Sequence, residues 1–332
     1  MSPTLSDHPS PRFAAIAIGR NEGERLKHCL LSLSRAALVI YVDSGSTDGS
    51  IEWAKELGVG VVELDTSVPF TAARARNAGF SRLRKTAPGI EYVQFLDGDC
   101  ELNQEWPSHA IAFLQANEDA CAAFGRRRER FPDRSIYNHL CDLEWNVPIG
   151  EARACGGDVM IHTIVLESVG GYRDDVIAGE EPELCVRLRA AGWHIWRLDF
   201  EMTLHDAAMT RFSQWWLRNV RSGYAFAQGA HLHGASPEHH WVWESRRALI
   251  WGLWLPIACI MAGAIFGSWG IAAWLIYPLQ TLRLMLRSQG SLKQRTILAF
   301  FQTLARFPEA LGQVRFKLDQ AMGRRAPLIE YK

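Results

Sequence analysis

The segment Tyr92-Val-Gln-Phe-Leu-Asp-Gly-Asp99 sets an apolar run directly before two carboxylates that stand two residues apart. A short apolar run bounded by turn residues is typical of a strand buried in a sheet. Ligands of open parallel sheets bind beyond the carboxyl ends of the strands. We therefore expect Asp97 and Asp99 to lie at the mouth of a binding crevice.

Outward from this segment, short apolar runs alternate with amphipathic stretches from Phe13 to about Asp206. The alternation predicts strand-helix-strand units around a largely parallel sheet. The other strands expected in the first half are Phe13–Ile18, Val39–Val42 and Val59–Leu64. The expected fold class is α/β, with a doubly wound mixed sheet followed by a C-terminal membrane hairpin and amphipathic helices.

Asp97, Asp99 and His205 are the candidate metal ligands. Two carboxylates at a strand end can meet one hard cation through oxygen, and Gly98 lets the turn approach a diphosphate. His205 ends a short apolar strand, where it is placed to complete the metal shell. Mg²⁺ and Mn²⁺ both accept these ligands, and the sequence does not separate them. The alternative for the acidic turn is a solvated loop without a metal.

Other residues that follow strands are candidates for nucleotide binding. Arg20, Asn21 and Glu22 come after the first strand, and Asp43 at the tip of the second suits hydrogen bonds to a nucleobase or ribose. Arg76 lies at a helix start rich in small residues, which suits diphosphate contact or an ordinary cationic helix surface.

Glu180 and Glu181 open a predicted helix that ends near Ala191. The helix dipole alone favours acidic residues in a first turn. A carboxylate at this position, near the expected metal crevice, also suits a general base that takes a proton from a hydroxyl.

Charge and cysteine content restrict the partners and the compartment. Lys plus Arg and Asp plus Glu number 36 each, so no global field indicates a nucleic-acid partner. The seven cysteines form no C-x-x-C pair, as a reducing compartment allows. Residues 1–11 lack the apolar core of a secretory signal. We expect the catalytic part in the cytoplasm.

Residues 248–277 carry no charge over a length greater than the about 20 residues that one membrane-spanning helix needs. Gly267-Ser268-Trp269-Gly270 divides this stretch. Arginines flank it on both sides, at 246 and 247 and at 283 and 287. The positive-inside tendency therefore predicts a hairpin or re-entrant loop in the inner (cytoplasmic) membrane, with the catalytic domain facing the cytoplasm.

Amphipathic helices are expected on either side of the hairpin. Arg211–Gln228 is rich in Trp and Arg, and Thr296–Met322 is a basic pattern that Pro308 should kink or split. The expected domains are a disordered N-terminus (1–11), a catalytic domain (12–230, with a nucleotide-binding half 12–100 and an acceptor half 101–230), a juxtamembrane linker (231–247), the hairpin (248–282) and an amphipathic, basic tail (283–332).

Several motifs occur in a fixed order. They are Arg20-Asn21-Glu22, the Asp-x-Gly-Ser-Thr-Asp-Gly loop at 43–49, Ala75-Arg76-Asn77-Ala78-Gly79, the Asp-x-Asp at 97–99, the Gly-Gly turn at 156–157 and Gly179-Glu180-Glu181-x-Glu183-Leu184. Together they resemble family 2 of the inverting glycosyltransferases, of the bacterial membrane-associated type, over about Phe13 to Gly229.

The resemblance implies a GT-A fold and transfer of a sugar from a nucleotide-sugar donor to an acceptor hydroxyl. It implies that Asp43 contacts the base, that Asp97 and Asp99 handle diphosphate and metal, and that the acid pair at 180 and 181 supplies the base. The family has Glu-Asp where this chain has Glu180-Glu181, so the implied base is a glutamate. The expected acceptor-binding residues are Gly156, Gly157, Asp158, Trp215 and Arg218.

The expected acceptor is a saccharide, free or polyprenyl-linked, in envelope polysaccharide or glycolipid synthesis. Two alternatives stay open. A nucleotidyltransferase also uses a doubly wound sheet with metal-binding carboxylates, although Gly19-Arg20-Asn21-Glu22 is a poor version of its Gly-rich loop. A catalytically inactive membrane scaffold would retain nucleotide binding alone.

Overall fold

The computed structural model of the protein describes residues 13–324. The expected disordered segment 1–11 and residues 325–332 of the expected tail lie outside the described residues. The described chain divides into two compact units. We call 13–175 with Glu180–Ala208 the sheet unit, and Val176–Gly179 with 209–324 the helical unit. The expected catalytic domain, 12–230, extends beyond the division at Ala208, and its limits stay a prediction.

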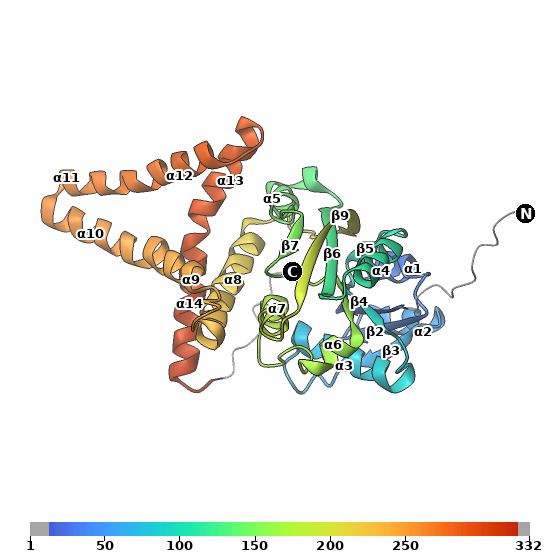
Figure 1. The fold of residues 1–332 in the computed structure, drawn as a ribbon. Helices are drawn as coiled ribbons and strands as arrows, with labels where there is room; N and C mark the ends of the chain where they lie inside the picture. The colour runs from blue at the N-terminus through green and yellow to red at the C-terminus, as the bar shows by residue number, and fades with distance from the viewer. Residues whose placement is uncertain (1–12, 325–332) are drawn as a thin grey trace, which may run out of the picture. The chain divides into compact units, whose positions relative to one another are not determined.

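The sheet unit contains one mixed sheet in the order β3-β2-β1-β4-β8-β6-β9-β5, with β7 paired to β9 (Figure 1). The neighbouring strands β3, β2, β1 and β4 are parallel, whereas β8 runs antiparallel to both β4 and β6. The strands are β1 Phe13–Gly19, β2 Leu38–Asp43, β3 Gly60–Glu63, β4 Tyr92–Asp97, β5 Cys100–Leu102, β6 Ala120–Glu129, β7 Gly150–Ala152, β8 Val159–His162 and β9 His194–His205. The predicted α/β fold class is therefore confirmed.

Helices cover both faces of the parallel half, because consecutive residues of β1, from Ala14 to Ala17, are all fully buried. A Cβ at Gly79 would lie 2.5 Å from a methyl carbon of Ile16, so the small residues of α3 let this helix lie close to the sheet. The helices of the unit are α1 Glu24–Ser32, α2 Ser50–Glu56, α3 Ala72–Thr86, α4 Trp106–Ala116, α5 Ile136–Glu144, α6 Thr163–Ser168 and α7 Glu180–Ala190.

The strand order reverses at β1, which has β2 on one side and β4 on the other. A crevice opens at such a switch point because the connections leave toward opposite sides. The register places Gly19 beside Asp43 and Ile18 beside Asp97. The ends of these three strands, and the loops that follow them, therefore lie at one level.

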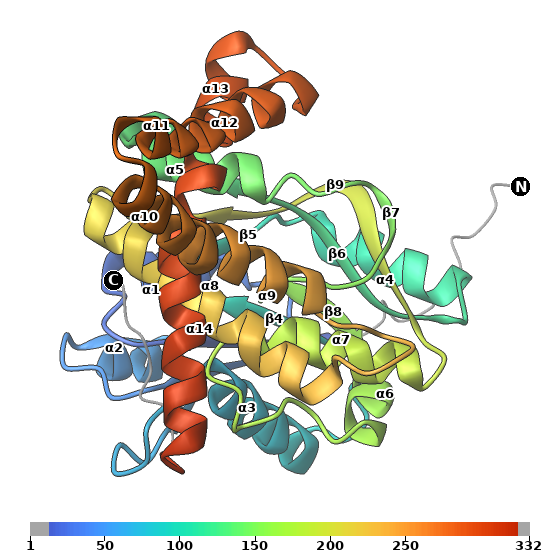
Figure 2. The ribbon, with the colours of Figure 1, turned by 90° about the vertical axis from the view of Figure 1, so that its left-hand side faces the viewer.

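The helical unit contains α8 Phe212–His233, α9 Val242–Leu249, η2 Ile250–Trp254, α10 Leu255–Phe266, α11 Ser268–Ile271, η3 Ala272–Leu275, α12 Ile276–Arg287, α13 Leu292–Leu304 and α14 Arg306–Ala321, and η2 joins α9 and α10 into one continuous helix. Helix α14 crosses α8 and packs against it (Figure 2). A Cβ at Gly223 would stand 2.0 Å from the Glu309 carbonyl oxygen, and one at Gly312 would stand 2.0 Å from that of Val220. Glycine on each helix thus allows a close backbone crossing that any side chain would prevent.

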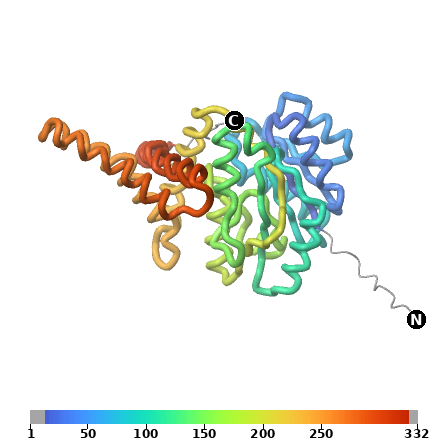
Figure 3. The backbone as a smooth tube through the Cα atoms, turned by 90° about the horizontal axis from the view of Figure 1, so that it is seen from above, coloured from blue at the N-terminus to red at the C-terminus, as the bar shows by residue number. Residues whose placement is uncertain are grey.

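Val242–Phe266 is the one helix of residues 13–324 that is long and apolar enough to cross a membrane. The chain turns at Gly267 and returns through α11 and α12 as a hairpin (Figure 1), whose arms overlap in the view from above (Figure 3). The arms touch near the turn, where a Cβ at Gly270 would lie 2.0 Å from the Ala262 carbonyl oxygen. The tip carries Trp269, which is 86% exposed. The structure is therefore consistent with the predicted membrane hairpin.

The predicted helical pattern 296–322 is divided at Ala305 into α13 and α14. Pro308 lies in the first turn of α14, where its missing N–H costs no helical hydrogen bond. The predicted split is confirmed. The break at Ala305 lies three residues before Pro308, because the proline ring excludes a continuous helix through the preceding turn.

Candidate active site

Two loops at the switch point are tied to each other. The Asn21 backbone N–H donates to Ser46 Oγ at 2.9 Å, and the Thr47 N–H donates to Asn21 Oδ1 at 2.8 Å. The Gly23 N–H donates to Asp48 Oδ2 at 2.9 Å. Asn21 adopts a positive φ of 56°, which asparagine tolerates better than most residues. These bonds give the loops after β1 and β2 a shared, defined shape.

Asp43 lies at the end of β2 and is 1% exposed. The Tyr41 hydroxyl donates to its Oδ1 at 2.7 Å, and the N–H groups of Gly45 and Ser46 donate to its Oδ2 at 2.8 Å each. The carboxylate thus shapes the loop from inside. Its contact with a nucleobase stays a prediction.

The other two loop residues predicted to bind the nucleotide have separate partners. The Arg20 guanidinium lies over the Phe70 ring, 4.6 Å from its centroid. Glu22 pairs with Arg25 at 2.7 Å. Neither residue joins the charged cluster described next, and a nucleotide role for each stays a prediction.

Arg76 is the centre of a buried charged cluster. Its Nη1 lies 2.8 Å from Glu180 Oε1 and 3.0 Å from Glu181 Oε1, and its Nη2 lies 3.0 Å from Asp97 Oδ1. Arg76 is 1% exposed and comes from α3, whereas Asp97 ends β4 and the glutamates begin α7. The structure therefore unites one predicted diphosphate-binding residue, one predicted metal ligand and both predicted catalytic acids.

The cluster contains more carboxylates than cations, because the single guanidinium of Arg76 faces Asp97, Glu180 and Glu181. Burial alone would lower the pKa of Arg76, but the carboxylates of Glu181, Asp97 and Glu180 raise it well above its usual value. Burial and the neighbouring Glu180 carboxylate raise the pKa of Glu181 to about 7, and Arg76 only partly opposes them. A carboxylate with a pKa near neutrality is suited to accept a proton during a reaction.

Gly157 lies against the cluster. A Cβ at this position would stand 2.5 Å from Arg76 Nη2, 3.1 Å from Glu181 Oε1 and 3.2 Å from Asp97 Oδ2. Any side chain here would therefore displace the arginine or its acids. A Cβ at Gly156 would meet no atom within 4 Å, so this residue leaves open space beside the cluster.

Asp158 is fully engaged by the protein. Arg127 Nε lies 2.8 Å from its Oδ2 and Arg127 Nη2 lies 2.7 Å from its Oδ1, while Thr203 Oγ1 donates to Oδ2 at 2.7 Å. Arg127 Nη2 also lies 3.5 Å from Asp97 Oδ2. Asp158 is 1% exposed, so an acceptor would reach its carboxylate only after this network opened. Its predicted acceptor contact stays a prediction.

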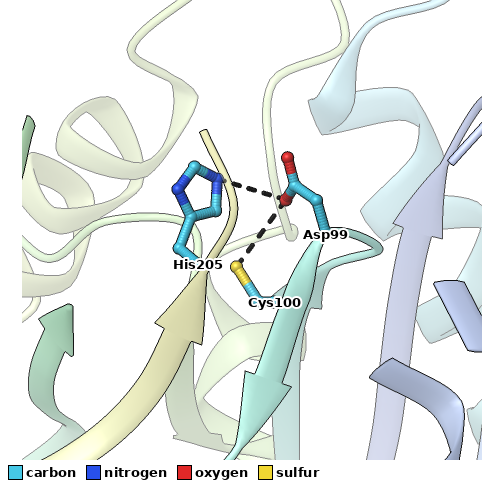
Figure 4. A group of neighbouring side chains, drawn as sticks. All are labelled: Asp99, Cys100 and His205. Carbon is cyan, nitrogen blue, oxygen red and sulfur yellow. Dashed lines mark hydrogen bonds and ion pairs between the residues drawn. The ribbon is translucent and has the colours of Figure 1, made fainter. Parts of the chain in front are cut away.

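Asp99, Cys100 and His205 form a second group beyond β4 (Figure 4). His205 Nε2 lies 3.2 Å from Asp99 Oδ1, and the Cys100 thiol lies 3.7 Å from the same oxygen. The buried Nδ1 of His205 has no hydrogen-bond partner in residues 13–324. The Trp145 ring stands edge-on to the imidazole at 4.6 Å between centroids.

This group fits a divalent cation through the Asp99 carboxylate and the His205 imidazole, which lie close together as predicted. Asp97 is not part of the same group, and its oxygens face Arg76 and Arg127. Asp97 is, however, 33% exposed at its side chain and only two residues away. It remains able to meet a cation that approaches from the crevice.

The last two predicted acceptor residues, Trp215 and Arg218, lie on α8 in the helical unit. Trp215 is 2% exposed and packs edge-on to Phe301, with 5.1 Å between ring centroids. Their predicted contact with an acceptor is not tested by the structure.

Sequence reasoning missed Arg127 and Thr203. The run Arg126-Arg127-Arg128 was a visible signal, because three cations within one strand place at least one side chain on the buried face.

Residues 16–163 match the family model described as glycosyl transferase family 2. A mannosyltransferase, PcManGT from Pyrobaculum calidifontis in complex with GDP-Man and Mn²⁺, is similar in fold, with a TM-score of 0.63 and 20% identity over 92% of this chain and 88% of that chain. S. aureus TarS (1–349) is also similar, with a TM-score of 0.53 and 15% identity over 94% of this chain and 92% of that chain. A comparison with curated proteins found no match. The fold is therefore GT-A, as the sequence motifs predicted.

Proposed function

We propose that the protein is an inverting, metal-dependent glycosyltransferase that moves a hexose from a nucleotide-diphosphate-sugar to an acceptor hydroxyl. One observation carries this proposal. Glu181, whose pKa is raised to about 7, lies 3.0 Å from Arg76 in a cluster with the carboxylate that ends β4. A base of this kind beside the switch-point crevice suits removal of a proton from a hydroxyl.

In this mechanism a Glu181 oxygen takes the proton of the acceptor hydroxyl. The hydroxyl oxygen attacks the anomeric carbon, and the bond from that carbon to the diphosphate breaks with its electron pair leaving on the diphosphate. Because attack and departure occur on opposite faces, one displacement inverts the anomeric centre. Arg76 is a positioning residue that orients Glu181, the absent side chain of Gly157 lets this ion-pair cluster form, and Gly156 leaves open space beside it.

Asp99, His205 and Asp97 would hold a divalent cation, Mg²⁺ or Mn²⁺. When bound, the cation neutralises the charge of the leaving diphosphate. The mannosyltransferase with a similar fold was crystallised with GDP-Man and Mn²⁺, which supports the choice of donor class and ion. His205 Nδ1 lies 4.0 Å from Glu129 Oε2, and this carboxylate would help to orient the imidazole toward the cation.

The acceptor is proposed to be a saccharide delivered at the inner membrane, in polyprenyl-linked form, for envelope polysaccharide or glycolipid synthesis. The exposed apolar hairpin supports this placement, because an exposed apolar surface of this size is costly in water. Arg246, Arg247, Arg283 and Arg287 flank its base and favour a cytoplasmic orientation of the domain.

The test uses the full-length chain in lipid nanodiscs with a panel of nucleotide-diphosphate-sugars, Mn²⁺ or Mg²⁺, and free or polyprenyl-linked saccharide acceptors. We expect release of nucleoside diphosphate and a product with inverted anomeric configuration by NMR. Release of pyrophosphate would instead show a nucleotidyltransferase. Nucleotide binding without transfer or donor hydrolysis would show an inactive scaffold.

Membrane attachment is tested separately by flotation with vesicles of phosphatidylglycerol and phosphatidylethanolamine. Placing a charge at the hairpin tip with Trp269→Asp should reduce the floated fraction, since this residue is 86% exposed in the apolar segment. The exposed substitution Arg82→Met, on α3, is the control and should float like the parent chain. Equal flotation of all three proteins would remove the hairpin from the membrane proposal.

A further inference from the structure

A cavity of about 500 Å³ in the sheet unit shares no lining residue with the Arg76 cluster or with the Asp99 group. It is lined by Asn103, Glu105, Arg126, Arg128, Asn146, Ile149, Arg197, Asp199, Phe200 and Glu201. Cavities of several hundred Å³ are of the size that holds small ligands. The motifs that carry the family resemblance include none of these residues.

Two buried guanidiniums lie among the lining residues. Arg126 is 5% exposed and Arg197 is 3% exposed. Arg126 Nη2 donates to Asp142 Oδ1 at 3.1 Å and to the Asp142 carbonyl at 2.9 Å. Arg197 donates to the Leu198 carbonyl, and its Nε has no partner in the described part of the chain. Of the two buried cations, Arg126 is hydrogen-bonded to the Asp142 carboxylate, whereas Arg197 has no hydrogen bond to a carboxylate of residues 13–324, although a buried charge normally requires its own partner.

The electrostatics of the two arginines agree with this geometry. Burial lowers the pKa of Arg197, and the nearby cations Arg126 and Arg128 lower it further against the opposing Asp199 and Glu201. Burial likewise lowers the pKa of Arg126. The charge of Arg128 is neutralised by Glu201, with which it forms hydrogen bonds of 2.8 to 2.9 Å. An added oxyanion would stabilise the buried pair.

The residues at the rim of the cavity suit the hydroxyl groups of a ligand, whereas the buried arginines suit an oxyanion. Asn103, Asn146, Glu105 and Asp199 are exposed there and offer amide and carboxylate groups suited to hydroxyls. Ile149 is 60% exposed, and Phe200 offers an aromatic surface that stacks on His109 at 3.8 Å between centroids. The rim carboxylates would repel a compact polyanion, whereas they can accept hydrogen bonds from a sugar.

We propose that this cavity is a binding site for a saccharide that carries one oxyanion, a carboxylate or a phosphate. The oxyanion would sit on Arg126 and Arg197, and the sugar hydroxyls would bond to the asparagines and acids of the rim. Arg127, which lies between two lining residues of β6, contacts Asp97 at the candidate active site. We infer that the cavity holds an acidic unit of the acceptor or product. This role rests on the proposed function, whereas binding of the acidic sugar does not.

The test is isothermal titration of the full-length protein in detergent, at 150 mM salt and without nucleotide, with four probes. The probes are glucuronate, glucose 6-phosphate, glucose and inorganic phosphate. We expect at least one acidic sugar to bind tenfold or more tightly than glucose and than inorganic phosphate. The carboxylate and phosphate arms show which oxyanion is preferred.

Two variants locate the binding. Arg197→Met should abolish it, Asn146→Ala should weaken it several-fold, and the control Arg82→Met should leave it unchanged. Unchanged binding of Mn²⁺ and nucleoside diphosphate by each variant shows that the fold is kept. The proposal would be overturned if neither acidic sugar bound, or if glucose or inorganic phosphate bound as tightly as the acidic sugars. It would also be overturned if Arg197→Met and Asn146→Ala bound the acidic sugar as tightly as the parent chain does. None of these outcomes depends on glycosyl transfer, so they are distinct from failure of the proposed function.

Discussion

Arginine is buried among different partners in the Arg76 cluster and in the cavity that Arg126 and Arg197 line. In the cluster three carboxylates surround one guanidinium, whereas in the cavity Arg126 pairs with Asp142 and Arg197 is hydrogen-bonded only to the Leu198 carbonyl among the described residues. The pKa of Arg76 is raised by its carboxylates, although burial opposes them, and the pKa of Arg197 is lowered by burial. The first site has excess negative charge and suits a proton or a cation. In the second, Glu105, Asp199 and Glu201 equal the lining arginines in number, but the buried Nε of Arg197 has no partner in residues 13–324, and we propose that an anion binds there.

Removing the central cation should have the largest effect. Arg76→Met would leave Asp97, Glu180 and Glu181 without their shared partner, and breaking a buried ion pair costs about 3–5 kcal/mol. We expect a fall of that size in the free energy of unfolding, measured in urea, together with loss of transfer. Arg82→Met should change stability by less than about 0.5 kcal/mol. A variant of Arg76 as stable as the parent chain would contradict the charge arrangement described here.

Glu181→Gln should separate stability from activity. Transfer should fall by about 10²–10⁴-fold, the usual contribution of a general base. The pKa of this glutamate is raised from 4.5 to about 7, so the folded state disfavours its charged form. The charged form therefore lowers the free energy of unfolding. This loss begins above the pKa of the unfolded state and is complete above the pKa of the folded state. The variant should therefore be more stable than the parent by about 1–3 kcal/mol at pH 8 and no more stable at pH 4.

The same pKa sets a pH profile for the parent chain. Because the base must be deprotonated, kcat/KM should rise through a pH of about 7 and then level off. The residual activity of Glu181→Gln should lack this rise. A rise of the same size in the variant would assign the titration to another group.

The sequence predicted the parallel half of the sheet and singled out the residues of the Arg76 cluster as candidate site residues, but it did not predict the ion pairs between them. Each strand of that half is an apolar run bounded by polar turns, so periodicity and topology placed Asp43 and Asp97 at strand ends correctly. The helix start around Arg76 was noted as rich in small residues, and the structure shows one use of them, since Gly79 lies against Ile16 of β1.

The mixed half of the sheet was less accessible to sequence reasoning. β6 and β9 pair with shifts of register between Phe124 and Arg127, and such bulges change which side chains share a face. Arg127 therefore reaches Asp158 while its two neighbours line the cavity. No local pattern predicts that division, because it depends on pairing between strands about seventy residues apart in the chain.

Thr203→Val should have a smaller effect that tests how Arg127 is held. Thr203 Oγ1 donates to Asp158 Oδ2 at 2.7 Å in a buried site, and losing a hydrogen bond to a charged group costs about 1.5–3 kcal/mol. We expect a loss of stability in that range and a lower kcat with little change in nucleotide affinity. Thr203→Ser keeps the hydroxyl and should restore both. A serine variant as impaired as the valine variant would point to packing instead.

Arg197→Met should have the smallest effect on stability, and it tests the comparison most directly. Removing one of two buried guanidiniums relieves their repulsion and the unpartnered Nε, while it gives up one hydrogen bond to Leu198. Because these terms oppose each other, the free energy of unfolding should change by no more than about 1 kcal/mol. Saturating glucuronate or glucose 6-phosphate should raise the melting temperature of the parent chain and leave that of the variant unchanged. A loss as large as that of Arg76→Met would show that the cavity arginine is already neutralised, and the contrast between the two sites would then be wrong.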